Sequence, residues 1–465
     1  MSAPAFRRPG PVDIAHHRHL TGVCEPQREE VDVRNLEVIG ELPTDITGAY
    51  LRNGPNPRFD PIGTYVYPLD GDGMVHRVEL SEGTARYTNR FVRTPMVVAE
   101  EKAGQVIWAG VTDPYTPAED EVGPELAGTR RELPDINVVR HDGRLLAMAE
   151  TTLPFQLNPD DLSTLGRTDC DGAMAVGSTA HPKIDPVTGE LVLFNYVLDA
   201  PYLTWSVVAP DGSLARPPTA VEGADTPLMI HDMALTGRYL VLMLCPLVFD
   251  MGAVITGGSV LDWRPEMGTR IALIPRDGGA VRWIGRDAYW VWHFANAFDL
   301  PDGRVSVDYV EWTYPAGFAK MDSPSLGTLV RAAIDPERGT VTRETVCERD
   351  VEFPRIDDRE ITKRHRTTAT VGKLGVRDGV LDSLWFFDTA TGSEAHWHPG
   401  RVSVGEPIFI PGSEHEYWGM IGTDLDDRSS WFFLLPAEDP AAGPLCTVRL
   451  PIRVPGGLHG AWLPG

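Results

Sequence analysis

The chain of 465 residues is 42% hydrophobic, which is enough for a substantial buried core. Its formal net charge of −24 argues against nucleic acid as a partner, because the phosphate backbone needs a basic surface. The five cysteines are widely spaced and form no Cys-x-x-Cys pair, which is typical of a reducing compartment. Without a signal-peptide-like start or a long apolar run, the sequence predicts a soluble cytoplasmic protein.

Residues 1–30 are polar and contain His16, His17 and His19, and we expect them to form a mobile N-terminal extension. From residue 31 to residue 465, proline and glycine are spread throughout, and no linker or low-complexity block divides the chain. This range is therefore predicted to be a single domain.

Short apolar and aromatic segments follow one another along most of this domain, separated by turn sequences. The turns include DPVTGE at 185–190, Asp211-Gly212, Asp277-Gly278, Asp302-Gly303 and DPERG at 335–339. Such turns between β-branched and aromatic runs indicate hairpins. Hairpins without helical crossovers predict an antiparallel all-β fold, in which closure of many strands favours a propeller or a large barrel. Residues 48–56 and the irregular region 225–265 are expected to be loops or short helices over one face.

Thirteen histidines are present, and most stand among polar residues, where a solvated side chain is the ordinary state. We expect this state for His141, His365, His396, His398 and His415. Four others lie among apolar or small residues, namely His181, His231, His293 and His459. A buried histidine needs a hydrogen-bond partner, which an ordinary core position can supply. Because the inner strands of a propeller converge on one axis, the four could also be ligands of a central metal ion.

Several sequence blocks together resemble the carotenoid cleavage oxygenases, a family of non-haem iron enzymes. The blocks are LRNGPNPRFDP (51–61), DGDGMVHRVEL (70–80), RLLAMAE (144–150), AHPKIDPVTGEL (180–191), IHDMALT (230–236), HFANAFD (293–299), EFPRIDDR (352–359), GEPIFIP (405–411) and VPGGLHGAW (454–462). The resemblance runs from about residue 30 to the C-terminus. It implies an all-β, seven-bladed β-propeller with loops and short helices capping the iron face.

In that family four histidines hold one Fe(II) ion, and the matching positions are His181, His231, His293 and His459. The family's three supporting glutamates match Glu150, Glu352 and Glu406, which leaves His181 without a carboxylate partner. A ligating histidine normally donates its other N–H to such a group, which fixes its tautomer and direction. The resemblance thus implies Fe(II), one per chain, and no catalytic residue beyond the metal centre. His76, in the DGDGMVH block, is expected to be structural.

The implied reaction adds O2 across a C=C bond of a small apolar alkene and gives two carbonyl products. An apocarotenoid-like polyene is the leading substrate, and a stilbenoid or phenylpropanoid alkene of the lignostilbene or isoeugenol type is the alternative. Isomerisation or ester hydrolysis on the same scaffold, and a non-catalytic carotenoid-binding propeller, are further alternatives.

Two positions depart from the family pattern. The lignostilbene branch has a lysine directly before the first glutamate, which pairs with a tyrosine to hold a phenolic hydroxyl. Here that position is Ala149, so Tyr115, the candidate tyrosine, would form an incomplete clamp, which favours a more apolar substrate. Ile136 stands where many relatives have a threonine beside the iron, which puts oxygen access in question.

Aromatic residues close to the histidines in sequence are candidates for the wall of the substrate tunnel, with core packing as the ordinary alternative. They are Trp292, Phe294, Phe298 and Trp462. The apolar segment 245–258 follows His231, and in the family a loop in this region contributes to a nonpolar entrance. Leu247, Val248 and Phe249 are therefore candidates for substrate uptake at a peripheral membrane contact, again with core packing as the alternative.

Overall fold

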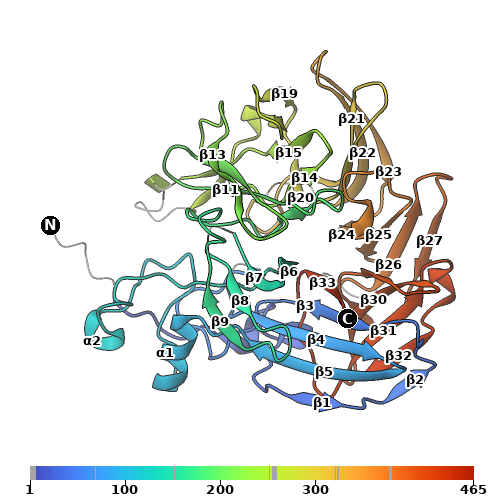
Figure 1. The fold of residues 1–465 in the computed structure, drawn as a ribbon. Coiled ribbons are helices and arrows are strands. Elements are labelled where there is room, and N and C mark those ends of the chain that lie inside the picture. Colours follow the sequence, from blue (N-terminus) through green and yellow to red (C-terminus); the bar gives the residue numbers. More distant parts are fainter. Residues whose placement is uncertain are drawn as a thin grey trace.

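The computed structural model describes residues 7–68, 70–150, 152–250, 252–253, 259–319, 321, 324–375 and 380–465. Its strands pair in antiparallel sheets, and seven of these sheets have four or more strands. Figure 1 shows the sheets standing around a central axis, in chain order from blue to red. The predicted seven-bladed β-propeller is therefore confirmed.

Five consecutive blades, from residue 137 to residue 397, have four strands each. They are β6 (Asn137–His141), β7 (Arg144–Met148), β8 (Phe155–Leu157) and β9 (Thr164–Arg167); β10 (Lys183–Ile184), β11 (Leu191–Tyr196), β12 (Leu203–Val208) and β13 (Leu214–Ala220); β14 (Ala234–Leu235), β15 (Tyr239–Leu244), β18 (Thr269–Pro275) and β19 (Arg282–Arg286); β20 (Trp290–Asp299), β21 (Val305–Trp312), β22 (Thr328–Asp335) and β23 (Thr340–Cys347); and β24 (Val351–Arg355), β25 (Thr367–Gly372), β26 (Ser383–Asp388) and β27 (Glu394–Trp397). A separate hairpin of β16 (Leu247–Phe249) and β17 (Leu261–Trp263) is inserted in the third of them.

The other two blades combine strands from both ends of the chain, which closes the ring. One contains β1 (Asp32–Arg34), β5 (Thr84–Phe91), β4 (Met74–Ser81), β3 (Gly48–Arg52) and the C-terminal strand β33 (Gly460–Pro464). The other contains β2 (Val38–Gly40), β32 (Cys446–Arg449), β31 (Ser430–Pro436), β30 (Glu416–Asp424) and β28 (Val402–Val404), with β29 (Ile408–Pro411) also paired to β30. Because β3 pairs with β33 from Gly48↔Pro464 to Arg52↔Gly460, the last residues of the chain lie at the centre of the fold.

Helices are few and short. Those whose bounds lie within the described residues are α1 (Pro95–Ala103), α2 (Glu119–Val122) and the 3-10 helices η1 (Ile14–His16), η2 (Gly22–Cys24), η3 (Pro265–Met267), η4 (Asp358–Glu360) and η5 (Pro440–Ala442). Helix α1 begins after Thr94, whose hydroxyl accepts from the N–H of Val97, and ends at Gly104 with φ of 68°. Among the helices in the described part of the chain, none has the length and apolarity needed to cross a membrane.

The core lies between neighbouring blades, and strand β11 shows how the sequence specifies this packing. Its residues are buried along the whole strand. Leu191 and Leu193 join a cluster with Met148 of β7, whereas Val192 and Phe194 join the large cluster that contains β15 and β18. Successive side chains of a strand point to opposite faces, so a continuous apolar run serves two blade interfaces at once.

Three expectations about local structure need correction. Residues 48–52 form β3 instead of a loop, and the region 225–265 contributes β14 to β17. His365 and His141 are buried: His365 Nε2 lies 3.2 Å from Asp308 Oδ2, and His141 Nε2 lies 3.0 Å from the carbonyl oxygen of Gly189. His396, His398 and His415 are exposed as expected.

The described part of the N-terminal segment lies against the propeller. Leu20 is buried, His19 stacks on Tyr67 with ring centroids 4.7 Å apart, and Gln27 Nε2 donates to the carbonyl of Arg453. All five cysteines are free thiols, in agreement with the sequence pattern.

Candidate metal centre

Four buried histidines meet at the propeller axis, each from a different blade. His181 lies two residues before β10, His231 three residues before β14, His293 within β20, and His459 directly before β33. One ring nitrogen from each lies within 4.8 Å of the others, a spacing that a single metal ion can bridge. The structure thus brings together the four residues that the sequence singles out.

Three carboxylates hold the outer nitrogens of three of these rings. Glu150 accepts from His231 Nδ1, Glu352 accepts from His293 Nδ1 at 2.6 Å, and Glu406 accepts from His459 Nδ1 at 2.9 Å. The three glutamates come from the three blades that supply no histidine, so each of the seven blades contributes one residue to the centre. Among the residues that the structure describes, His181 has no carboxylate partner.

This arrangement fits a cation. Because a carboxylate only accepts, Nδ1 carries the proton in the three paired rings and Nε2 carries a lone pair. The Nε2 atoms of His231 and His293 are 3.2 Å apart, and those of His293 and His459 are 3.1 Å apart. Lone pairs at this distance repel unless a positive ion lies between them. Three buried carboxylates with one nearby guanidinium, Arg355, also leave two negative charges for a divalent ion to balance.

The ionisation of the centre agrees with ligand function, since ligands must be neutral imidazoles. Burial and the neighbouring imidazoles hold the pKa of His181 well below its ordinary value. Burial lowers the pKa of His459 to about 4, against the opposing effect of Glu406. Burial alone would raise the pKa of Glu406, but Arg355 and His459 outweigh it and bring the value to about 2, so this group stays a carboxylate.

Local irregularities in the strands aim these side chains at the axis. The pairing of β20 with β21 shifts register on both sides of Phe294, next to His293, and that of β24 with β25 shifts after Glu352. Bulges of this kind redirect side chains near functional sites. Beside His459, a Cβ on Gly460 would lie 2.1 Å from the carbonyl oxygen of Leu51, so only glycine permits this approach of β33 to β3.

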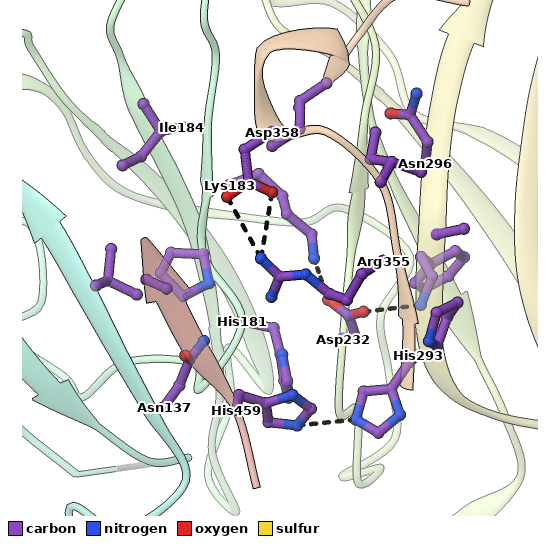
Figure 2. Close-up of a pocket in the computed structure, with 18 of the residues that line it drawn as sticks. Asn137, His181, Lys183, Ile184, Asp232, His293, Asn296, Arg355, Asp358 and His459 are labelled. Carbon is purple, nitrogen blue, oxygen red and sulfur yellow. Dashed lines mark hydrogen bonds and ion pairs between the residues drawn. The ribbon is translucent and has the colours of Figure 1, made fainter. Parts of the chain in front are cut away.

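Two cavities reach the histidines, and one of them also has ion pairs on its wall. One has a volume of about 380 Å³, contacts His231, His293 and His459, and is lined largely by apolar side chains. Its apolar wall includes Ile136, Trp292, Trp312, Phe318, Phe353 and Leu381. The other has a volume of about 350 Å³ and contacts His181, His293 and His459. Figure 2 shows its polar wall, where Lys183 pairs with Asp232 and Arg355 with Asp358.

The residues that the sequence suggested for the tunnel wall are distributed over both cavities. Ile136 and Trp292 line the apolar cavity, and Trp292 packs edge-on against His231 at 5.0 Å. Phe294 and Trp462 line the cavity that contacts His181 instead. Ala149 packs with Ile136 in a small cluster behind the apolar cavity.

Other candidates lie elsewhere and are corrected. Phe298 is buried with its ring edge-on to His365. Tyr115 packs with Ile62 and Ala109 and donates its hydroxyl to Glu121, so it forms no substrate clamp. Leu247 and Val248 are buried, and Phe249 packs against the same core cluster, because β16 pairs with β17 there. Core packing, the alternative for these three residues, is what the structure shows.

Sequence reasoning missed three residues at the centre. Phe353 lies with its ring 5.2 Å from that of His293 and 5.1 Å from that of His459, and Trp312 Nε1 donates to Glu352 Oε1 at 2.9 Å. Arg52 lines the apolar cavity. Phe353 stands in the EFPRIDDR block and Arg52 in the LRNGPNPRFDP block. These blocks were therefore the sequence signal that could have identified the two residues. His76 contacts Tyr87 through Nδ1 and is not part of the histidine group.

Comparison with known proteins agrees with this geometry. The family model of the retinal pigment epithelial membrane protein, RPE65, matches residues 24–464. A carotenoid cleavage oxygenase of Mycobacterium tuberculosis is 32% identical over 96% of this chain and 97% of its own length. An isoeugenol monooxygenase of Pseudomonas nitroreducens is 29% identical over 96% of this chain and 98% of its own.

Solved structures show the same likeness over nearly the full length. The lignostilbene dioxygenase of Pseudomonas brassicacearum has a TM-score of 0.87 at 28% identity, covering 98% of this chain and 100% of the other. A variant of Synechocystis apocarotenoid oxygenase has a TM-score of 0.83 at 28% identity, covering 95% and 97%. With its four converging imidazoles, the chain belongs to the RPE65 and carotenoid cleavage oxygenase family.

Proposed function

We propose that this protein is a non-haem Fe(II) dioxygenase that cleaves a C=C bond of an apocarotenoid-like polyene with O2. The observation that carries this proposal is the group of four imidazoles opening into an apolar, aromatic cavity. Imidazole also suits zinc and copper, but zinc has no redox chemistry with which to activate O2. Iron is proposed because the chain belongs to a family of oxygenases and its ligand set fits a divalent ion.

Bound at the imidazoles, Fe(II) would supply the electrons that activate O2 toward an alkene. The balanced reaction is R–CH=CH–R′ + O2 → R–CHO + OHC–R′, so one C=C bond and one O–O bond break and two C=O bonds form. No proton is taken up or released, and the reaction needs no acid or base from the protein. The protein's part is to hold the ion and place the double bond against it.

Particular residues perform this part. Glu150, Glu352 and Glu406 fix the direction of three imidazoles through their Nδ1 hydrogen bonds. Trp292 and Phe353, which contact the imidazoles, line the apolar cavity and would exclude water from the reacting bond. A conjugated chain is flat and apolar, and aromatic walls suit it.

A stilbenoid or phenylpropanoid alkene is the second candidate substrate. It is favoured by the names of the relatives, which include isoeugenol monooxygenase and lignostilbene dioxygenase. It is disfavoured by the missing phenol clamp, since Ala149 carries no polar group and Tyr115 is engaged with Glu121. A reducing, cytoplasmic location is also proposed, and the five unpaired cysteines support it.

A substrate panel tests the proposal. Protein loaded with Fe(II) is incubated in air with an apocarotenal, resveratrol and isoeugenol, and the products are identified by mass spectrometry. We expect loss of polyene absorbance and two carbonyl products from the apocarotenal. Cleavage of resveratrol or isoeugenol alone would favour the second candidate, and isomerised or hydrolysed products without cleavage would contradict both.

A further inference from the structure

Arg52, the last residue of β3, is a buried cation that no carboxylate of the described residues pairs with. It is 3% exposed and lines the apolar cavity that reaches the histidines. Its guanidinium donates from Nη2 to the carbonyl of Pro455 at 2.6 Å, and its Nε has no hydrogen-bond partner. Within the described ranges of the chain, no carboxylate lies within 4.0 Å of it. An unpaired buried charge is costly, so this position calls for an anion.

The other arginine that is buried among the described residues, Arg77, lies 2.7 Å from Glu79, and two half-buried arginines are paired as well. Arg131 lies 2.7 Å from Asp72 and 2.8 Å from Glu100. Arg355 lies 3.2 Å from Asp358 and 3.5 Å from Glu406. At these three arginines the fold supplies carboxylates, whereas among the described residues it supplies none at Arg52.

Arg52 reaches the apolar cavity between closely packed glycines. A Cβ on Gly457 would lie 2.5 Å from its Nε, and a Cβ on Gly405 would lie 3.0 Å from its Nη1. Only glycine therefore allows the backbone to come so close to the guanidinium at these two positions. Ser403 and Gly456 line the same cavity, and Trp292 and Phe318 belong to its aromatic part.

We propose that Arg52 binds the carboxylate of the substrate, so that the alkene cleaved by this enzyme is a conjugated acid. This inference rests on the proposed alkene-cleaving function and names the substrate class for the same cavity. Arginine matches a carboxylate geometrically, because its planar N–H groups can donate two parallel hydrogen bonds to the two oxygens. The aromatic part of the cavity then takes the apolar remainder of the chain.

The position of the anchor also sets which bond is cleaved. Arg52 pairs with Gly460 across β3 and β33, and Gly457 lies two residues before His459, a span of at most about 7 Å. An acid held at Arg52 keeps the double bonds near its carboxylate closest to the histidines. The products would be a long aldehyde and a short oxo acid: R–CH=CH–R′–COO⁻ + O2 → R–CHO + OHC–R′–COO⁻.

Binding without turnover gives the most direct test. Protein loaded with Zn(II), which cannot activate O2, is titrated with an apocarotenoic acid and with its methyl ester, and quenching of tryptophan fluorescence gives both dissociation constants. We expect the wild type to bind the acid about 10–100-fold more tightly than the ester. Arg52→Met should reduce this preference to about one, and Arg52→Lys should restore part of it.

Arg282→Met is the matched control, because Arg282 is an exposed arginine on β19 and lines neither cavity. It should keep the preference for the acid. Equal affinity of the wild type for acid and ester would overturn the proposal even if Arg52→Met failed to fold, and so would an unchanged preference in Arg52→Met. If Fe(II)-loaded protein cleaves the ester, the proposed alkene cleavage stands, whatever the role of Arg52. If the protein binds the acid tightly but cleaves no alkene, the result contradicts the proposed alkene cleavage and leaves the role of Arg52 intact.

Discussion

Replacing Glu352 with glutamine removes one negative charge from the metal centre with almost no change in size. Glu352 accepts from His293 Nδ1 at 2.6 Å, from the N–H of Phe353 at 2.5 Å and from Trp312 Nε1 at 2.9 Å. All three partners are donors, and they are shared between both oxygens of the carboxylate. An amide has only one oxygen, and its NH2 group is itself a donor. In either orientation of the glutamine, this NH2 faces at least one N–H.

Leaving one buried donor unsatisfied costs about 1–3 kcal/mol. Loss of a carboxylate that orients a ligating histidine typically weakens metal binding about 10–100-fold, which is the change we expect for Glu352→Gln. Competition with a chelator of known Fe(II) affinity measures it. Glu414→Gln, at an exposed carboxylate, serves as the control and should bind iron like the wild type. Equal iron affinity of Glu352→Gln and the wild type would refute the idea that this carboxylate orients His293.

The remaining predictions concern the ligands and the C-terminus. His293→Ala should abolish iron retention and turnover, because His293 faces both His231 and His459 across 3.1–3.2 Å; metal analysis of the purified variant checks this, and full activity would disprove the ligand role. A chain ending at residue 458 should lose iron and unfold at a lower temperature, since it lacks His459 and β33, whereas removal of Pro464 and Gly465 alone should keep the iron content of the intact chain. In the metal-free protein, burial lowers the pKa of His459 from 6.5 to about 4. Folding therefore favours the neutral ring, and the free energy of unfolding should fall as the pH drops from 6.5 towards about 4. Urea titrations should show this fall less in His459→Gln, and an identical slope in the variant would argue against it.

The sequence was sufficient for the fold and for the seven residues at the centre because short blocks carry them. Hairpin turns such as Asp302-Gly303 are local signals, and the structure indeed joins β20 to β21 there. Apolar surroundings set the four histidines apart, and the family resemblance then identified them as ligands of one ion, since no spacing relates His181 to His459. Geometry then added what the blocks do not state, namely that each blade supplies one residue.

What the sequence could not show depends on contacts between distant segments. Residues 48–52 read as a loop because their strand partners are residues 76–80 and 460–464, and no local pattern reveals these pairings. His365 reads as exposed because its neighbours in sequence are charged, yet Asp308 from β21 meets it in the core. Leu247 shows a third limit: an apolar segment has the same composition in a core as at an entrance.

The central claim is that the four histidines hold an ion that cleaves an alkene with O2. The most direct test uses protein loaded with one Fe(II) per chain, an apocarotenoid and ¹⁸O2, with the aldehydes reduced at once to alcohols so that their oxygen cannot exchange with water. We expect two cleavage products, each carrying one ¹⁸O atom. Products without the label, or loss of the substrate without cleavage, would contradict the proposed reaction.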